Sequence, residues 1–244
     1  MTTVNPLQTQ INSVIALYSN GQIEEALDSV GALIKDYPDE ALLYNISGIC
    51  YKTIGKLDEA VKSFEKALAI KPDYAEVHYN LGVTLHDLGQ LDAAVKSYEQ
   101  ALAIKPDYAE VHSNLGLTLQ ELGQLGVAVK CYEKAVALKP DYAEAYQNLG
   151  SVLSGLKRED EALVSYESAI ALNPNLDFIL GDLLSTKMSL CLWDDLTKRL
   201  NELTKKINND EKVIIPFSFI ALIDDPEVQR KNTEIYANEK YPQS

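Results

Sequence analysis

Asparagine side chains recur every 34 residues in the middle of the chain, at Asn80, Asn114 and Asn148, and Asn12 lies on the same register. A carboxamide offers two hydrogen-bond donors and an acceptor. A row of such amides on one surface could hydrogen-bond the main chain of an extended peptide, with little dependence on the peptide's side chains. Ile46 occupies the one remaining place and breaks the row. The alternative is that these asparagines are solvated polar residues on an open helix face.

Further side chains are expected on the same helix face as the asparagines. A helix of 3.6 residues per turn brings to one face the positions one residue before, and three, six and seven residues after, each asparagine place. These positions form a mostly polar surface with an apolar stripe, and they are Asn45, Ile49, Lys52, Tyr79, Val83, His86, Asp87, Ser113, Leu117, Gln120, Glu121, Gln147 and Ser151.

The chemically reactive residues do not indicate catalysis. His86 lies on the expected face, but one histidine without partners makes neither a metal site nor a general base. Cys50, Cys131 and Cys191 are odd in number and form no CxxC pair, so we expect small core residues in a reducing compartment rather than disulfides or a zinc site. The sequence has no Gly-rich phosphate loop and no nucleophile motif. We therefore expect a non-enzyme without a cofactor or a metal.

The charge of the chain limits its partners. It holds 36 Asp and Glu against 22 Lys and Arg, a net charge of -14, and residues 1–176 carry -11 of this. A broad surface that neutralises phosphates is not expected, and neither is a nucleic-acid partner. The N-terminus has no basic region before its apolar residues, and no apolar stretch is long enough to span a bilayer. These features predict a cytoplasmic protein that does not bind membranes.

The asparagine interval belongs to a repeat of the whole sequence. KPDYAEVHYNLG begins at Lys71, KPDYAEVHSNLG at Lys105 and KPDYAEAYQNLG at Lys139. A period near 34 is typical of stacked helical hairpins. With Ala75 as the first place of a unit, five units follow one another, each closed by a proline, and they span residues 7–40, 41–74, 75–108, 109–142 and 143–176.

Small and aromatic residues recur within the units. The twentieth place is always Ala, the eighth is Gly in four units, and the twenty-fourth is aromatic in the same four, as in Gly82, Ala94 and Tyr98. We expect the two helices of a unit to approach each other at the small residues, where a larger side chain would overpack the contact. His78 and His112 stand at the aromatic place of the first helix and are expected in the core.

One unit illustrates the expected helix boundaries. Asp73 followed three residues later by Glu76 reads as a capping box at the start of the first helix. That helix is predicted to run to about Leu88, with Gly89 in the turn and a second helix over about 91–104. Glu76 and its counterparts Glu110 and Glu144 are therefore assigned to capping, although the alternative is a preference for basic peptides.

The repeated residues resemble the tetratricopeptide repeat family, and the resemblance covers residues 7–176. It implies an all-α, right-handed superhelix (an α-solenoid) of five repeats, in which the first helices line a concave groove and the second helices face outward. Family members that clamp the C-terminal carboxylate of chaperones need several Lys or Arg in the groove. Lys52 is the one base offered here, so a clamp of that kind is disfavoured.

The pattern loosens after Pro174. Apolar residues at helical spacing over 177–191, followed by an amphipathic stretch from Trp193 to Ile207, predict a degenerate sixth helical pair over 177–210 that seals the solenoid. Residues 211–244 are expected to form a C-terminal helical junction. Within them the run VIIPFSFIALI, 213–223, is expected to be buried, and Asp225 and Pro226 should start a last helix through about Asn238.

The C-terminal segment has a second resemblance. LCLWDDLTKRLNEL followed by IPFSFIALIDDPEVQRKNTEIYA is similar to the junction between repeats and catalytic lobes in SPINDLY-like O-linked N-acetylglucosamine transferases. The positions that would bear a nucleotide-sugar site are absent from this sequence, so the resemblance transfers no catalytic residue.

Together these patterns lead to two hypotheses. The first is a non-catalytic module that binds a protein or an extended peptide in the groove, as the substrate-recognition part of a SPINDLY-like glycosyltransferase. The alternative is a free-standing scaffold or assembly adaptor unrelated to sugar transfer. Self-association through the solenoid is compatible with either.

Overall fold

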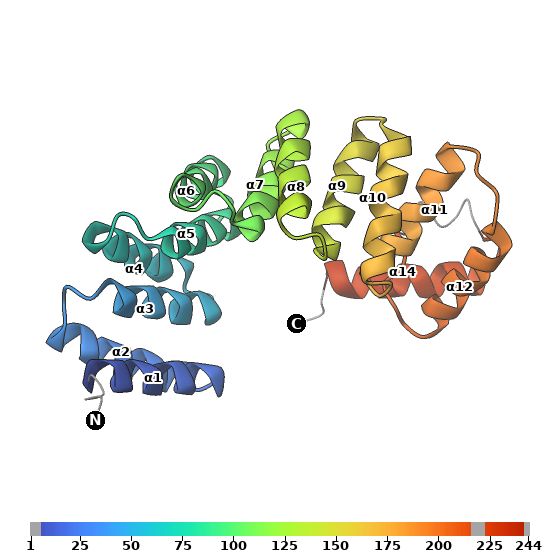
Figure 1. Cartoon of the computed structure of the whole chain (residues 1–244). Coiled ribbons are helices and arrows are strands. Elements are labelled where there is room, and N and C mark those ends of the chain that lie inside the picture. The colour runs from blue at the N-terminus through green and yellow to red at the C-terminus, as the bar shows by residue number, and fades with distance from the viewer. Residues whose placement is uncertain (1–5, 216–222, 242–244) are drawn as a thin grey trace, which may run out of the picture. The chain divides into compact units, whose positions relative to one another are not determined.

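The computed structural model describes residues 6–215 and 223–241, and these residues form thirteen helices and no strand (Figure 1). The expected all-α solenoid is thereby confirmed. The helices are α1 (Pro6–Ser19), α2 (Ile23–Asp36), α3 (Ala41–Thr53), α4 (Leu57–Ile70), α5 (Ala75–Asp87), α6 (Leu91–Ile104), α7 (Ala109–Glu121), α8 (Leu125–Leu138), α9 (Ala143–Gly155), α10 (Glu159–Leu172), α11 (Ile179–Ser189), α12 (Leu196–Asn208) and α14 (Pro226–Lys240).

The chain divides into two compact units, Met1–Leu122 and Gly123–Ser244. The N-terminal unit contains α1 to α7, and the C-terminal unit contains α8 to α14. Within each unit, helices that follow one another in the sequence pack together, as α3 does with α4 and α9 with α10. The first helices of neighbouring repeats also touch, since α5 contacts both α3 and α7.

The small residues at the eighth place allow the two helices of a repeat to pack closely. A Cβ added to Gly82 would lie 2.6 Å from the ring of Tyr98, which is 1% exposed. Gly48 meets Phe64 and Gly150 meets Tyr166 in the same way. The close helix approach expected from the sequence is present in these three repeats, and the residue that the glycine meets is the aromatic one at the twenty-fourth place.

The turns between the two helices of a repeat also follow the 34-residue register. Gly21, Gly55, Gly89 and Gly123 have φ between 72° and 78°, which glycine adopts without strain. The register continues without glycine, because Lys157 has φ 63° and Cys191 has φ 56°. Cys191 is exposed, so its predicted place in the core is wrong: the turn that it occupies lies at the surface.

The predicted capping boxes are not formed. The residue that caps α5 is Tyr74, and no side chain caps this helix end. Asp73 lies one residue too early, while the Tyr74 carbonyl accepts hydrogen bonds from the amides of Val77 and His78 at 3.0 and 3.1 Å. The helices α7 and α9 likewise begin without a side-chain cap. Capping therefore does not account for Glu76, Glu110 and Glu144.

The KPDY loops are stabilised in another way. Lys71 Nζ lies 4.5 Å from the centre of the Tyr74 ring, a cation–π contact. His78 Nε2 donates a hydrogen bond of 2.9 Å to the carbonyl of Pro72, and His112 makes the same bond to Pro106. Both histidines are half-buried, so their predicted role as core residues is corrected: they fasten the first helix to the preceding loop.

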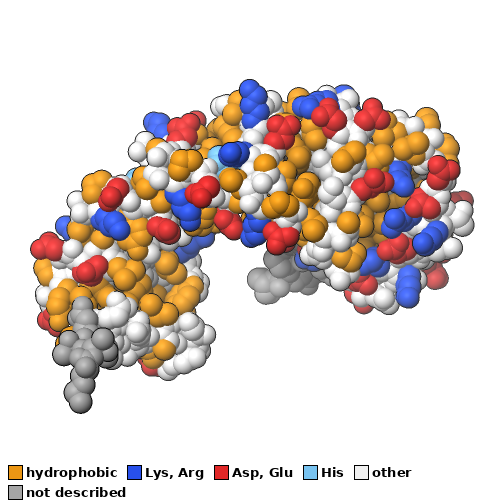
Figure 2. All heavy atoms as spheres, in the orientation of Figure 1, with side chains coloured by type: hydrophobic (Ala, Val, Ile, Leu, Met, Phe, Trp, Pro, Cys, Tyr) orange, Lys and Arg blue, Asp and Glu red, His pale blue; other side chains and the backbone are white. Residues whose placement is uncertain are grey.

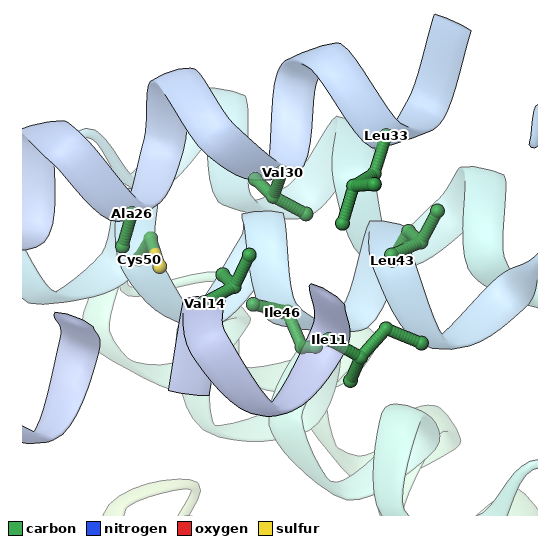
Figure 3. Packing of buried hydrophobic residues seen from close by; sticks show 8 residues of the cluster. All are labelled: Ile11, Val14, Ala26, Val30, Leu33, Leu43, Ile46 and Cys50. Carbon is green, nitrogen blue, oxygen red and sulfur yellow. The ribbon is translucent and has the colours of Figure 1, made fainter. Parts of the chain in front are cut away.

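The first repeat has a core without the glycine–aromatic contact. Its buried residues come from α1, α2 and α3 and point toward one another in Figure 3: Ile11, Val14, Ala26, Val30, Leu33, Leu43, Ile46 and Cys50. Val14, at the glycine place, and Val30, at the aromatic place, are 2% and 1% exposed. Two medium side chains thus fill the space that one glycine and one ring fill elsewhere. Burial raises the pKa of the Cys50 thiol.

The segment after the fifth repeat departs from the expected hairpin. Trp193 does not begin a helix; it is 54% exposed, and α12 starts at Leu196. Asp195, with φ 59°, interrupts the helical backbone just before α12. The predicted helix start is therefore wrong by three residues. Leu203 and Ile207, within the stretch predicted to be amphipathic, are buried.

A short stretch of chain outside the helices, residues 212–214, packs against the start of α11. The carbonyls of Lys212 and Val213 accept hydrogen bonds from the amides of Phe178 and Gly181 at 2.8 and 2.9 Å. A Cβ on Gly181 would lie 2.6 to 2.8 Å from atoms of Ile214, one of them the backbone Cα. This stretch therefore satisfies amides that would otherwise be unpaired at a helix N-terminus.

The last helix begins where the sequence predicts. Asp225 Oδ1 accepts hydrogen bonds from the amides of Glu227 and Val228 at 3.0 and 3.2 Å, and Pro226 is the first helical residue. Of the run expected to be buried, Val213 and Ile214 are buried and Ile223 is half-buried, but Ile215 is 44% exposed, so the prediction is wrong there; residues 216–222 lie outside the described residues. No helix in the described part of the chain is long and apolar enough to cross a membrane.

Candidate functional site

Side chains of α3, α5 and α7 form a surface that we call the first-helix face of the N-terminal unit. All of its members are exposed or half-buried: Lys52, Tyr79, Asn80, Val83, His86, Asp87, Asn114, Leu117, Gln120 and Glu121. Val83 and Leu117 supply the apolar stripe between the amide-bearing and charged residues. The expected combination of residues on one side of adjacent first helices is therefore present within this unit.

The two asparagines of this face are held in the same way. Asn80 Nδ2 donates a hydrogen bond of 3.0 Å to Asn45 Oδ1, and Asn114 Nδ2 donates one of 3.1 Å to the Tyr79 hydroxyl. In each case the sixth residue of one repeat donates to the fifth residue of the repeat before it. Since an amide nitrogen carries two hydrogens, each asparagine keeps a second N–H and a carbonyl oxygen for another partner.

Asn45 is a correction to the predicted site. It is 7% exposed, and its Oδ1 accepts the hydrogen bond from Asn80. Ser113, at the same place two repeats later, is 3% exposed. Asn45 therefore positions Asn80 and does not itself face a ligand.

A second set of links joins the twelfth place of one repeat to the thirteenth of the next. Lys52 Nζ lies 3.3 Å from Asp87 Oδ2, and His86 Nε2 lies 3.1 Å from Glu121 Oε1. Tyr18 and Thr53 share a hydrogen bond of 3.1 Å in the equivalent position. Pairs as exposed as these contribute about 0–1 kcal/mol each, so their main effect is to fix side-chain positions. The Lys52 charge is already paired, which fits the prediction against a chaperone-tail clamp.

Two predicted residues, Tyr79 and Asn12, have further local contacts. Tyr79 packs its ring 5.3 Å from that of Tyr108 and 6.3 Å from that of Tyr98, measured between centres. Asn12, in the first repeat, is exposed and accepts a hydrogen bond of 3.0 Å from Gln8. Asn12 therefore has a local partner on its own helix, unlike Asn80 and Asn114.

The C-terminal unit has its own first-helix face on α9 and α11. Gln147 and Asn148 are half-buried residues of α9. Gln147 Nε2 donates to the carbonyl of Asp177 at 2.8 Å and to Asp182 Oδ2 at 3.3 Å. The second bond joins the fifth place of one repeat to the sixth of the next, as in the N-terminal unit. Asp182 is thus a site residue that the sequence reasoning missed.

Burial raises the pKa of Asp182 from its usual 3.8 to about 6, and the hydrogen bond from Gln147 partly opposes this rise. Ionising Asp182 thus costs more free energy in the native state than in the unfolded chain. The protonated carboxyl favours the native state fully below pH 3.8, and this contribution is lost as the pH rises through about 6.

Asp182→Asn is therefore expected to raise the thermal unfolding midpoint at pH 8, with a difference from the wild type that shrinks as the pH is lowered to 4. Thermal melts of both proteins across this range test the expectation. Asp177→Asn, which changes an exposed carboxylate five residues away, is the control. A difference between Asp182→Asn and the wild type that stays constant with pH would contradict it.

In the described residues, no three His, Cys, Asp or Glu side chains lie close enough together to share a metal ion. On the face seen in Figure 2, acidic and basic side chains are interspersed with apolar ones. The chemistry that the site residues offer is hydrogen bonding, apolar contact and charge pairing.

Comparisons with protein families identify the repeats. A family model described as "TPR repeat" matches residues 48–89 and 84–123, and one described as "Tetratricopeptide repeat" matches residues 107–175. Together these matches cover more than half of the chain. A search of curated proteins found no match.

Solved structures with the same fold include three that illustrate the range of similarity. The crystal structure of MamA is 26% identical over 65% of this chain and 93% of its own, with a TM-score of 0.62. YrrB, described as a TPR protein with an unusual peptide-binding site, is 25% identical over 68% of this chain and 86% of its own, with a TM-score of 0.59. PilF of Pseudomonas aeruginosa is 17% identical over 82% of this chain and 90% of its own, with a TM-score of 0.74. At this identity the similarity shows the fold alone.

Proposed function

Because the chain belongs to the tetratricopeptide repeat family, we propose that it is an adaptor that holds another polypeptide, in extended form, against the first helices of its repeats. The observation that carries this proposal is the common orientation of Asn80 and Asn114, each fixed by one hydrogen bond to the preceding repeat. An extended main chain presents N–H and C=O groups in both directions, and each asparagine amide still has a donor and an acceptor to offer it.

The neighbouring residues suit such a ligand. Val83 and Leu117 provide apolar contact beside the asparagine amides. The pairs Lys52–Asp87 and His86–Glu121, at the twelfth and thirteenth places, add charged side chains to the same face. The asparagines are held before a ligand arrives, so binding would not require their side chains to lose much conformational freedom. YrrB, whose description mentions a peptide-binding site, offers a precedent among proteins of this fold.

We favour a scaffold or assembly adaptor over a role in sugar transfer. MamA, YrrB and PilW, the last described as a type IV pilus biogenesis factor, are tetratricopeptide neighbours whose descriptions mention no glycosyltransferase. The proposed resemblance to a SPINDLY-like junction depends on Trp193, which is exposed and outside any helix, and on residues 216–222, which lie outside the described residues. It therefore receives less support than the adaptor function.

Removal of the amides tests the proposed function. Replacing Asn80, Asn114 and Asn148 together by Ala is expected to abolish capture of the partner polypeptide from an extract of the native cell, because each amide would supply main-chain hydrogen bonds of about 1 kcal/mol. The helical circular dichroism signal should be unchanged. A matched control replaces three exposed asparagines elsewhere, Asn20, Asn201 and Asn238, and should capture the partner as the wild type does.

Photo-cross-linking locates the captured polypeptide. A photoreactive residue at Val83, on the first-helix face, should cross-link to it, whereas the same residue at Val164 should not. Val164 is 63% exposed on α10, a second helix. Cross-linking from Val164 alone, or undiminished capture by the triple asparagine variant, would refute binding at the first-helix face.

A further inference from the structure

The row of sixth-place residues ends in a carboxylate. The register that contains Asn80, Asn114 and Asn148 reaches Asp182 after another 34 residues. Asp182 keeps the hydrogen bond to the fifth place of the preceding repeat, but its direction is reversed: Gln147 donates and Asp182 accepts. A change from amide to carboxylate preserves the shape of the side chain and replaces a donor by a negative charge.

The charge on Asp182 is not balanced by a cation. Among the residues that the structure describes, no Lys, Arg or His nitrogen lies within 4.0 Å of its carboxylate. The basic residue at this end of α11, Lys212, lies 3.6 Å from Asp177 instead. Gln147 Nε2 donates two hydrogen bonds, one of 3.3 Å to Asp182 Oδ2 and a shorter one of 2.8 Å to the carbonyl oxygen of Asp177.

The groups around Asp182 add no positive charge. The α9 helix presents the neutral Gln147 to Asp182, and Tyr166 of α10 lies close enough for the Asp182 charge to act on its phenol. Burial and the Asp182 charge both raise the pKa of this phenol, so Tyr166 stays neutral near pH 7. A half-buried carboxylate with one long hydrogen bond from a neutral amide is incompletely compensated, and such a group gains from a cationic partner.

We propose that Asp182, held by Gln147, binds the ammonium of a Lys or the guanidinium of an Arg in the docked polypeptide. This inference rests on the proposed function and adds a chemical preference to it. The asparagines bind main chain and are indifferent to sequence, whereas the last position of the row selects a basic side chain. Asp182 Oδ1, which has no hydrogen-bond partner among the described residues, is the atom available to the cation.

A pair of short peptides tests the inference on the whole chain. Both are blocked at their ends and built from Ala and Ser; one carries a central Lys and the other a central Gln. We expect the Lys peptide to bind about tenfold more tightly, because its ammonium adds a charge-assisted hydrogen bond in a partly buried setting. Nuclear magnetic resonance provides the readout. The Lys peptide should shift the side-chain amide signal of Gln147 and lower the titration midpoint of the Asp182 carboxyl carbon.

Two variants separate this site from general electrostatic attraction. Asp182→Asn introduces the residue that the row has elsewhere, so it should fold, and it should remove the preference for the Lys peptide. Asp177→Asn removes the same charge from an exposed position just before α11 and should keep the preference. Equal binding of the two peptides to the wild type, or an unchanged preference in Asp182→Asn, would overturn the inference.

The same measurements distinguish the inference from the function on which it rests. If both peptides bind and the triple asparagine variant binds neither, but the wild type shows no preference, the adaptor function stands and the cation site fails. If neither peptide binds the wild type and the triple variant still captures the native partner, both proposals fail.

Discussion

Gly82→Ala is expected to lower the free energy of unfolding by about 1–3 kcal/mol, the usual range for overpacking a filled core. The new Cβ would lie 2.6 Å from the Tyr98 ring, closer than real Cβ contacts allow. Tyr98 is 1% exposed and packs against Tyr79, so its ring has no free space to move into. Helix propensity acts in the opposite direction, because Ala favours a helix more than Gly does, and the steric effect has to exceed it.

Gly31→Ala is the matched control for this substitution. Gly31 lies inside α2 of the same unit, and nothing lies within 4 Å of the position that its Cβ would take. Here the gain in helix propensity is unopposed, and we expect stabilisation by about 0.5–1 kcal/mol. Urea unfolding of both variants gives the comparison. Equal effects of the two substitutions would mean that the glycine at the eighth place does not set the distance between the helices.

Gly181→Ala should be the most damaging small substitution in the C-terminal unit, by about 1–3 kcal/mol or more. The added Cβ would meet Ile214 at 2.6 to 2.8 Å, and one of the atoms is the Ile214 Cα. A side chain can rotate away from such a contact, whereas backbone has to move as a segment. We expect residues 212–214 to detach from α11, with the loss of two hydrogen bonds to the amides of Phe178 and Gly181.

Hydrogen exchange measures this detachment directly. The amides of Phe178 and residue 181 should exchange faster in Gly181→Ala, while amides in the middle of α9 keep their wild-type rates. Gly126→Ala, in an open position on α8 of the same unit, is the control and should leave all of these rates unchanged. Unaltered protection of Phe178 in Gly181→Ala would show that residues 212–214 tolerate the added methyl group.

Much of the fold could be predicted because the same pattern of small, aromatic and proline residues recurs in successive repeats. The boundaries of α6, Leu91–Ile104, and the turn at Gly89 agree with the prediction, since a pattern shared by several repeats averages out local exceptions. Residues 177–241 offer only a single copy of their pattern. There the apolar spacing indicates an amphipathic helix, in which Leu203 and Ile207 prove to be buried, but it places the start of α12 three residues too early, at Trp193.

The errors at the site have a common physical origin. Sequence spacing predicts which residues share a helix face, but it does not reveal which of them hydrogen-bond to the neighbouring repeat. Spacing places Asn45 on the binding surface for this reason, although Asn45 is 7% exposed and its side chain accepts a hydrogen bond from Asn80. Asp73 illustrates the same limit, because Asp and Glu at capping-box spacing do not by themselves fix where the helix begins. Asp182, by contrast, could have been found by extending the asparagine register once more.

The even spacing of the turn residues with positive φ limits the ways in which the number of residues in such a chain can change during evolution. The positive-φ residues in the turns between paired helices, from Gly21 to Cys191, recur every 34 residues, and the second helix of one repeat packs against the first helix of the next, as α4 does with α5 and α8 with α9. Recombination between the nearly identical stretches at Lys71 and Lys105 would add or remove one complete unit and rejoin compatible surfaces. A deletion of any other size would bring unlike places together, so gene variants of this chain should differ by whole repeats.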